Sequence, residues 1–297
     1  MHSMYKECNP TPALSPKMLL FNEDLAKEIN LHYLIENSNE RLDILSGNKL
    51  IKDSKPIAFA YSGHQFGHFN PNLGDGRALL LGEILDQQGK LKDIQLKGSG
   101  RTPFSRRGDG KSALGPVLRE YLISESMHIL GIPTTRSLAA INTGEKVHRD
   151  EETYGGIMTR VASSHIRIGS FEYAYKNKDI SVVKDLADYS ISRHYPDTAS
   201  LDNPYLAFFA AVCNEQASLV ASWMTVGFIH GVMNTDNMAI SGETIDYGPC
   251  AFMDAYDPAT VFSSIDVNGR YAYGNQPAIL TWNLTRLAET LIPLVNK

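Results

Sequence analysis

Residues 230–249 read HGVMNTDNMAISGETIDYGP, and this stretch decides the interpretation of the whole chain. The amide of Asn237 precedes the carboxylate of Asp246 by nine residues. The segment MAISGETID is predicted to form a strand, a turn at Gly242 and a second strand, which would bring the two side chains together. Oxygen ligands of this kind suit Mg²⁺, whose coordination shell is completed by substrate phosphates. An ordinary hairpin with two polar residues at its ends is the alternative interpretation.

The same stretch follows most of a protein-kinase pattern. A kinase has His-Arg-Asp, four further residues and Asn, and later Asp-Phe-Gly. Here His230 and Asn237 stand at the His and Asn positions, and Asp246 begins Asp-Tyr-Gly. Val232 stands where a kinase has its catalytic Asp. The sequence therefore keeps the metal-binding positions of a kinase and lacks its catalytic base.

Two charged residues extend this pattern toward the N-terminus. Lys97 ends the predicted strand 91–97, and a kinase pairs such a lysine with a helix carboxylate that fixes the ammonium group against phosphate oxygens. Glu120 and Glu125 both lie on the helix predicted over residues 112–130. Glu120 is preferred as the partner because it lies in the apolar half of that helix, and Glu125 is the competing choice.

The Gly-rich turn NLGDGR, which contains Gly74, Gly76 and Arg77, lies between two predicted strands. Such a turn lets backbone N–H groups approach phosphate closely, although an ordinary hairpin turn is the commoner reading. In the preceding stretch GHQFGH, His64 and His68 are expected to organise a loop, with a metal-binding pair as the weaker alternative.

The order of the predicted elements indicates an α+β fold with two lobes, like that of a protein kinase. Strands are predicted over 56–62, 77–85, 91–97 and 155–162, with the helix 112–130 among them, and helices dominate from about residue 181. The expected domains are an N-terminal extension, a strand-rich nucleotide-binding lobe and a helical lobe with the metal-binding segment. Their predicted bounds are 1–55, 56–175 and 176–297.

Bulk composition narrows the class of protein. Of the 297 residues, 43% are hydrophobic and 21% are charged, as in ordinary globular proteins, and a net charge of −5 argues against a nucleic-acid binder. Cys8, Cys213 and Cys250 have no disulfide or zinc spacing and suit a reducing compartment. No signal peptide or membrane span is recognisable, so a soluble cytoplasmic protein is expected.

Four long motifs of the chain resemble the selenoprotein O family, called YdiU in bacteria, and the resemblance covers essentially the whole sequence. The motifs are YSGHQFGHFNPNLGDGRA (61–78), QLKGSGRTPFSRRGDGKSALGPVLREYLISE (95–125), HGVMNTDNMAISGETIDYGPCAFMD (230–254) and GRYAYGNQPAI (269–279). The resemblance implies a pseudokinase fold that holds ATP reversed relative to a kinase. It also implies a protein adenylyltransferase, which transfers AMP to Ser, Thr or Tyr hydroxyls of proteins. Bacterial members are associated with UMP transfer and with manganese as well.

The resemblance further implies roles for individual residues. Asp236 matches the family's proton acceptor, and Asn237 and Asp246 match its metal ligands. Glu120 matches the ion-pair partner of the phosphate-binding lysine. The positions that match nucleotide-binding residues of the family are Gly74, Gly76, Arg77, Lys97, Asp109, Gly110, Arg160, Arg167 and Asp246. Members of the family run longer, so a chain ending at Lys297 is expected to be C-terminally truncated relative to them.

A reversed nucleotide accounts for Val232. If the α-phosphate is the reacting group, a base at the kinase position has nothing to act on, and Asp236 is the nearest replacement. The expected cofactor is Mg²⁺ or Mn²⁺, and the expected partners are ATP, or UTP, and proteins with hydroxyl side chains. Neither nucleic acid nor a membrane is expected as a partner. Two alternatives stay open, namely a non-catalytic ATP-binding pseudokinase and a conventional phosphotransferase that uses Asp236 as a displaced base.

Overall fold

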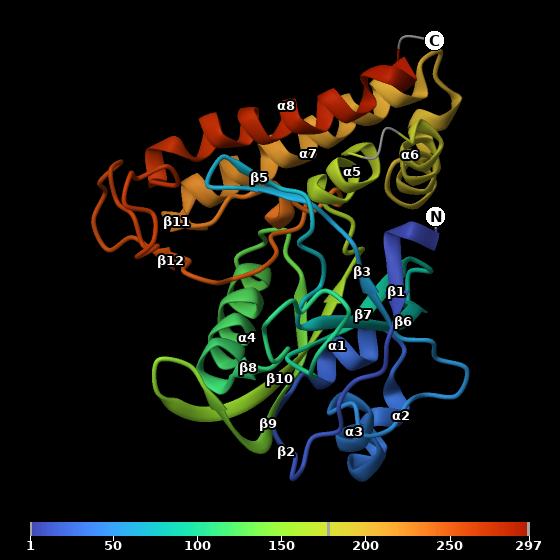
Figure 1. Ribbon diagram of the computed structural model, residues 1–297, viewed down its shortest axis with the longest axis vertical. Helices are drawn as coiled ribbons and strands as arrows, with labels where there is room; N and C mark the ends of the chain where they lie inside the picture. The colour runs from blue at the N-terminus through green and yellow to red at the C-terminus, as the bar shows by residue number, and fades with distance from the viewer. Residues whose placement is uncertain (1, 177–178, 296–297) are drawn as a thin grey trace.

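A computed structural model describes residues 2–176 and 179–295 of the chain, with the N-terminal half built on one antiparallel sheet (Figure 1). The strands pair in the order β1-β3-β6-β7-β10-β9-β2, and β8 pairs with β10. Their bounds are Tyr5–Glu7 (β1), Lys17–Phe21 (β2), Ile57–Phe59 (β3), Ala78–Leu85 (β6), Leu91–Lys97 (β7), Ser112–Ala113 (β8), Arg136–His148 (β9) and Glu152–Ala162 (β10).

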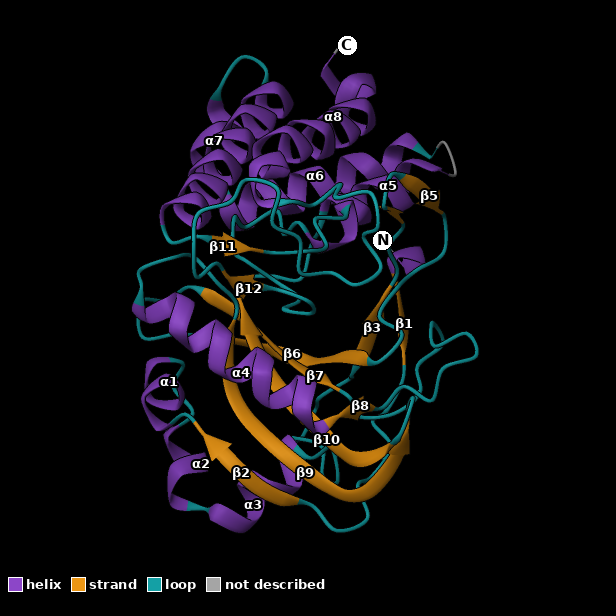
Figure 2. Ribbon diagram, turned by 90° about the vertical axis from the view of Figure 1, so that its left-hand side faces the viewer, coloured by secondary structure: helices purple, strands orange, loops and turns teal. Residues whose placement is uncertain are grey.

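The two faces of this sheet carry different side chains. Because successive residues of a strand point to opposite faces, Leu96 of β7 lies on one face, and Gln95 and Lys97 lie on the other. Three short helices complete an apolar core that includes Leu96 on one face. On the other face a longer helix packs its Val117 against Met158 of β10 (Figure 2). The helices are Glu23–Glu28 (α1), His32–Glu36 (α2), Ser38–Leu45 (α3) and Leu114–Ile129 (α4). Gln95 and Lys97 therefore share a face of the sheet with α4.

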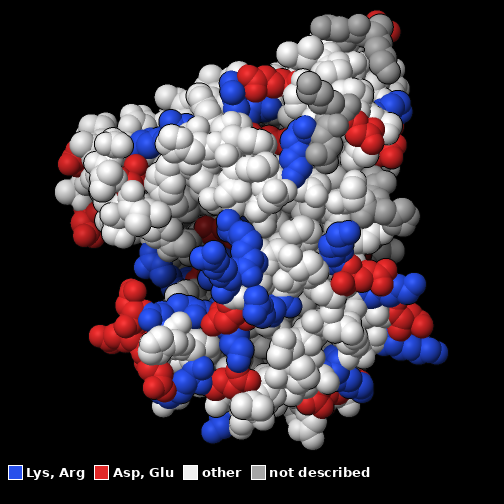
Figure 3. Space-filling view, viewed as in Figure 1, with Lys and Arg blue, Asp and Glu red and all other residues white. Residues whose placement is uncertain are grey.

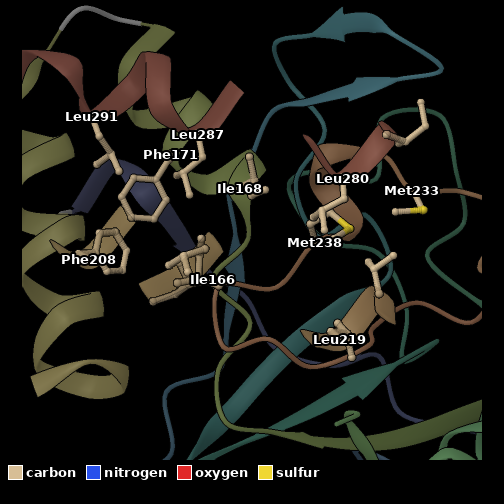
Figure 4. Packing of buried hydrophobic residues seen from close by; sticks show 14 of the residues in the cluster. Ile166, Ile168, Phe171, Phe208, Leu219, Met233, Met238, Leu280, Leu287 and Leu291 are labelled. Atoms are coloured by element: carbon tan, nitrogen blue, oxygen red, sulfur yellow. The ribbon is translucent and has the colours of Figure 1, made fainter. Parts of the chain in front are cut away.

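Helices make up most of the remaining chain. They are Ile168–Lys176 (α5), Ile180–His194 (α6), Pro204–Thr225 (α7) and Gln276–Val295 (α8). Their shared core includes Phe171 of α5, Phe208 of α7 and Leu287 of α8 (Figure 4). At the start of α7, the Asn203 side chain accepts the backbone N–H of Leu206, an ordinary N-cap. No helix in the described ranges is both long and apolar enough to cross a bilayer.

Short elements connect these parts. One hairpin joins β4 (Gly63–Gln65) to β5 (His68–Asn70), and a second small sheet pairs β11 (Phe228–Ile229) with β12 (Ala251–Phe252). The short 3₁₀ helices are His2–Met4 (η1), Pro196–Ser200 (η2), Thr235–Asn237 (η3) and Tyr273–Asn275 (η4). The β4–β5 hairpin contacts both α5 and η3, so it lies against the short helix that contains Asp236 and the predicted metal ligand Asn237.

The predicted fold class is confirmed, because a strand-rich part is followed by a mostly helical part. The predicted strands 56–62, 77–85, 91–97 and 155–162 appear as β3, β6, β7 and β10, and the helix 112–130 appears as α4. The predicted N-terminal extension supplies β1 and β2 to the sheet. The division into three domains stays a prediction.

The turn predicted around Gly242 is present, with Met238 and Thr244 paired across it, but the regular strands predicted on its two sides are wrong. Residues 238–246 are all described and contain no regular strand, because Met238 and Thr244 form only one isolated bridge. The segment is held instead by distant parts of the chain, through isolated bridges of Ala239 to Arg167 and of Thr244 to Thr134. A local pattern could not reveal these pairings, because their partners are remote in sequence.

Candidate functional site

A cleft of about 1180 Å³ lies where the sheet face that carries Lys97, the helix α4 and the segment 232–248 meet. Figure 3 shows Lys and Arg side chains gathered around a hollow on one face of the molecule. All of the site residues predicted from the sequence line this cleft, namely Gly74, Gly76, Arg77, Lys97, Asp109, Gly110, Glu120, Arg160, Arg167, Asp236, Asn237 and Asp246. Their proximity is therefore a property of the fold, while their roles stay predictions.

Strand register places the polar groups on the floor of the cleft. Gln95 of β7 lies opposite Arg160 of β10, and Lys97 lies two residues further along the same face. Glu120 comes from the buried face of α4, and its carboxylate is 2.6 Å from the Lys97 ammonium group. The alternative partner, Glu125, binds the Arg136 guanidinium at 2.8 Å instead. The Lys97–Glu120 pair expected from the sequence is thus present.

Asp246 is the carboxylate on which the cations of the cleft converge. One of its oxygens is 2.9 Å from the Lys97 ammonium and 2.7 Å from the Arg160 guanidinium, and the other accepts a hydrogen bond from Arg167. Burial alone would raise the pKa of this carboxyl group, but the charges of Lys97, Arg167 and Arg160 hold it well below its ordinary range. Asp246 therefore stays ionised at any ordinary pH.

The backbone of Asp246 is also unusual. Its φ of +64° lies in the left-handed region, which non-glycine residues seldom adopt, although Asp tolerates it better than most. Strained backbone of this kind persists only where the surrounding contacts hold it, and it is frequent at functional sites. The ion pairs to three cations supply such contacts here.

Two buried arginines connect the sheet to the segment that follows it. Arg160 is 1% exposed and donates to the Gln95 side chain at 2.6 Å. Arg167 donates to the backbone carbonyl of Asp236 at 2.7 Å, and its guanidinium also lies over the Tyr61 ring. Burying a guanidinium without compensation is costly, so these positions require the acidic and carbonyl partners that surround them.

Asp236 lies in η3 and is 6% exposed. Its Oδ2 accepts a hydrogen bond from Gln65 Nε2 at 3.2 Å, whereas Oδ1 is buried and has no hydrogen-bond partner among the described residues. Burial raises the pKa of Asp236 to about 6, against the opposing charge of Arg167. A carboxylate with a pKa raised toward neutrality suits a general base. Val232 lines the same cleft and offers no proton acceptor.

The Gly-rich turn forms another wall of the cleft. Gly74 has a φ of +70°, and a Cβ there would lie 2.4 Å from the Phe104 ring, so a side chain would collide. The residue between the two glycines, Asp75, is buried and accepts the backbone N–H of Phe59. Arg77 is exposed at the edge of the turn. The turn therefore brings backbone close to the cleft, as phosphate binding requires.

Asp109 lies at the rim and not on the floor of the cleft. Its carboxylate is exposed and forms an ion pair with Arg149 at 2.9 Å, and the hydrogen bond from Arg149 lowers the pKa of Asp109. The neighbouring Gly110 has a φ of +70°, and a Cβ there would collide with the Gly100 backbone. This tight crossing fixes the loop that carries Arg106 and Arg107, which also line the cleft.

The donor groups at Asn237 and Asp246 fit Mg²⁺ or Mn²⁺. Asn237 Nδ2 donates to the Val232 carbonyl at 2.9 Å, which commits the amide nitrogen and leaves the amide oxygen as the ligand atom. The described residues contain no cluster of three or more His, Cys, Asp or Glu side chains that could enclose a metal. Mg²⁺ needs no such enclosure, since one or two protein oxygens and substrate phosphates suffice.

Several residues that line the cleft or hold its lining residues in place are not predicted by the sequence. Asp75 lies inside the turn NLGDGR, of which only the glycines and Arg77 are predicted site residues. Gln95 holds the Arg160 guanidinium, and its position two residues before Lys97 on the same strand face could have revealed it. Gln65 had no signal of its own, since only the fold brings it to Asp236. The predicted loop around His64 is the β4–β5 hairpin, and the His64 ring binds the Glu172 carboxylate.

Comparison with known proteins gives a consistent result. The family described as "Protein adenylyltransferase SelO" matches residues 2–297. "Protein nucleotidyltransferase YdiU" from Cereibacter sphaeroides is 61% identical over 298 residues, covering 100% of this chain and 62% of the relative. The protein of the same name from Brevibacillus brevis is 60% identical over 295 residues, covering 99% of this chain and 60% of the relative.

Among solved structures, ROP2 from Toxoplasma gondii, described as a virulence factor with a protein-kinase fold and no enzymatic activity, is similar with a TM-score of 0.35 and 13% identity. The match covers 77% of this chain and 67% of that one, and a likeness this weak supports no argument. The chain spans about three fifths of the length of the curated relatives it matches. The family match over residues 2–297 and the high identity show that this chain belongs to the protein adenylyltransferase SelO family, also called YdiU.

Proposed function

We propose that this chain transfers AMP from ATP to Ser, Thr or Tyr hydroxyls of proteins, and that UTP can serve as a second nucleotide donor. The observation that carries the proposal is the convergence of Lys97, Arg160 and Arg167 on Asp246 at the floor of the cleft. Several fixed cations in one cleft suit a triphosphate, and the family to which the chain belongs is named for nucleotidyl transfer.

The cations and the Gly-rich turn would bind the phosphates. Lys97 is held by Glu120 and the guanidinium of Arg160 by Gln95, so neither side chain has to reorganise when charge develops on the phosphates. Asn237 and Asp246 would hold Mg²⁺ or Mn²⁺, which would neutralise phosphate charge there. Arg77 and Asp109 at the rim would contact the outer parts of the nucleotide.

Asp236 would act as the general base for the acceptor hydroxyl. The hydroxyl oxygen forms a bond to the α-phosphorus, the bond from that phosphorus to the bridging oxygen of the β-phosphate breaks, and pyrophosphate leaves. The hydroxyl proton passes to the Asp236 carboxylate, which has an oxygen without a hydrogen-bond donor among the described residues. Phosphoryl-type transfer depends mainly on positioning and charge stabilisation, so a base displaced from the kinase position is sufficient.

Two other functions remain as alternatives. A non-catalytic ATP-binding pseudokinase would use the same cations without transfer, and a conventional phosphotransferase would use Asp236 as a displaced base. Val232 at the kinase base position disfavours the second. We also propose a cytoplasmic setting, because Cys8, Cys213 and Cys250 are all free thiols, as is usual in a reducing compartment.

Labelled nucleotides test the proposal. Purified protein is incubated with a cell lysate and with ATP labelled on either the α- or the γ-phosphate, in the presence of Mg²⁺ or Mn²⁺. The α-label should appear on protein, and the γ-label should be released as pyrophosphate. Transfer of the γ-label alone would support the phosphotransferase, and the absence of both from folded, ATP-binding protein would support the non-catalytic alternative.

A further inference from the structure

The β4–β5 hairpin, residues 63–70, has no part in the function proposed above, yet its turn is strained. Phe66 and Gly67 form a two-residue loop in which both φ angles are positive, +52° and +85°. Turns of this kind favour Asn, Asp or Gly at the first position, and a bulky residue there is strained. Contacts elsewhere must therefore hold the hairpin in this shape.

These contacts reach the segment immediately before Asp236, either directly or through Tyr271 and Glu172. The Phe66 N–H donates to the Asn234 side chain at 3.2 Å and to the Tyr271 hydroxyl at 3.0 Å. The His64 N–H donates to the Thr235 hydroxyl at 2.7 Å. The ring of His64 and the hydroxyl of Thr235 also share the buried carboxylate of Glu172 as a partner. The hairpin is thus fixed to Asn234 and Thr235 by both backbone and side-chain groups.

The hairpin also gives the two carboxylate oxygens of Asp236 different surroundings. Gln65 Nε2 donates to Oδ2 at 3.2 Å, the only side-chain hydrogen bond to this carboxylate among the described residues. Gly63 lies against Oδ1, where a Cβ would be only 2.3 Å away. The missing side chain at Gly63 leaves room for Oδ1, and no group of the hairpin donates to it. Oδ2 is therefore held by Gln65, and Oδ1 is packed against Gly63 without a donor.

We propose that Gln65 is a positioning residue, which orients the Asp236 carboxylate toward the acceptor hydroxyl through the hydrogen bond to Oδ2. The proposal rests on the proposed function, in which Asp236 accepts the hydroxyl proton. A hydrogen bond to an ionised acceptor is among the stronger ones, and a displacement of a catalytic group by about 1 Å can cost about 100-fold in rate. The Phe66 strain is then the cost of holding Gln65 in place.

Replacing Gln65 should have different effects if the residue only stabilises the fold and if it positions Asp236. If Gln65 only stabilised the fold, its replacement would lower the melting temperature and weaken ATP binding whether or not Asp236 were present. If Gln65 acts through Asp236, its replacement should slow transfer only while that carboxylate is present. Residues that act as one unit show non-additive effects of this kind.

The test compares Gln65→Leu with His68→Gln. His68 lies directly opposite Gln65 in the hairpin and is exposed, so its replacement is a control for general damage to the hairpin. Transfer of α-labelled AMP to lysate protein is measured for both variants, alone and combined with Asp236→Ala. We expect Gln65→Leu to lower kcat by about 10- to 100-fold with the KM for ATP unchanged, and His68→Gln to leave both unchanged. In the Asp236→Ala background, Gln65→Leu should have no further effect.

A second measurement does not depend on transfer. In protein carrying ¹³C-labelled aspartate, the carboxyl resonance of Asp236, assigned from Asp236→Asn, should shift in Gln65→Leu and stay in place in His68→Gln. An unmoved resonance would overturn the proposal, as would an equal loss of kcat with and without Asp236. If the wild-type protein transfers no AMP, the proposed function fails, and the resonance still decides whether Gln65 orients this carboxylate.

Discussion

Two clusters of buried charge lie at opposite ends of the same strand, β7, and they differ in what they face. The cleft cluster consists of Lys97, Glu120, Arg160, Arg167 and Asp246, and every member lines the cleft. The junction cluster consists of Asp93, His165 and Arg193, and none of its members lines the cleft. Burial of charge alone therefore does not distinguish a candidate site from a structural contact.

Nearly all of the side-chain polar atoms in the junction cluster have a hydrogen-bond partner. Asp93 binds the Arg193 guanidinium at 2.6 Å through one oxygen and the His165 ring at 2.9 Å through the other. Since Asp93 lies on β7 and Arg193 on α6, the cluster ties the sheet to the helical part. In the junction cluster, Arg193 meets two carboxylates, those of Asp93 and Glu83, and the backbone is ordinary. In the cleft cluster, three cations meet at Asp246, whose backbone is left-handed. The excess of cations and the strain suit a site that receives an anionic ligand.

The largest effect is expected from Asp246→Asn. Loss of the carboxylate removes the charge that the three cations surround and one of the two proposed metal ligands, so turnover should fall by at least about 10³-fold. Transfer of α-labelled AMP measures this, with the matched substitution Asp93→Asn as the control that should keep its turnover. Wild-type turnover of Asp246→Asn at ordinary Mg²⁺ would contradict the role given to the cleft cluster.

Asp236→Ala should lower turnover by about 10²–10⁴-fold, the range for loss of a general base. ATP affinity, measured by calorimetry, should stay near that of the wild type, because Asp236 is proposed to contact the acceptor hydroxyl and not the nucleotide. If Asp236→Ala also lost ATP binding, the residue would belong with the metal ligands.

Asp93→Ala should lower the free energy of unfolding and leave the function of the cleft unchanged. The substitution removes the more deeply buried of the two carboxylates that pair with Arg193, while Glu83 remains. Breaking a buried ion pair from one side costs about 3–5 kcal/mol of unfolding free energy at most when a second partner is kept. Urea denaturation measures this loss, and the folded protein should bind ATP as the wild type does. Unchanged stability combined with lost ATP binding would remove the distinction between the two clusters.

A smaller change in the free energy of unfolding is expected when the pH is lowered. Burial lowers the pKa of His165 from 6.5 to about 4 in the folded chain. Between these two pH values the unfolded chain binds more protons than the folded one, so the unfolding free energy should fall as pH falls below 6.5. This histidine contributes about 1.4 kcal/mol per pH unit in that window. Urea denaturation at pH 7.5 and 5.5 should show a shallower pH dependence in His165→Gln, and an unchanged slope would mean that His165 is not buried in its neutral form.

The sequence could predict the features that depend on residues close together in the chain, and it could not predict those that depend on distant residues. A run of β-favouring residues and the turn after it located β6 and β7, and the position of Glu120 on the apolar half of α4 selected the partner of Lys97 correctly. The same reasoning failed at residues 238–246, where single bridges to Thr134 and Arg167 override the local pattern. It also missed Gln65, because a distance of 171 residues separates it from Asp236 in the sequence. The four long motifs still identified the other site residues, but only through their resemblance to a known family.

The most direct test of the difference between the clusters is calorimetric titration of ATP with and without Mg²⁺. Wild-type protein and Asp93→Asn should both bind ATP more tightly when Mg²⁺ is present, because their cleft clusters are intact. Asp246→Asn should lose this dependence on Mg²⁺ while it remains folded by circular dichroism. If Asp246→Asn kept the dependence and Asp93→Asn lost it, the cleft cluster would not be the metal–nucleotide site.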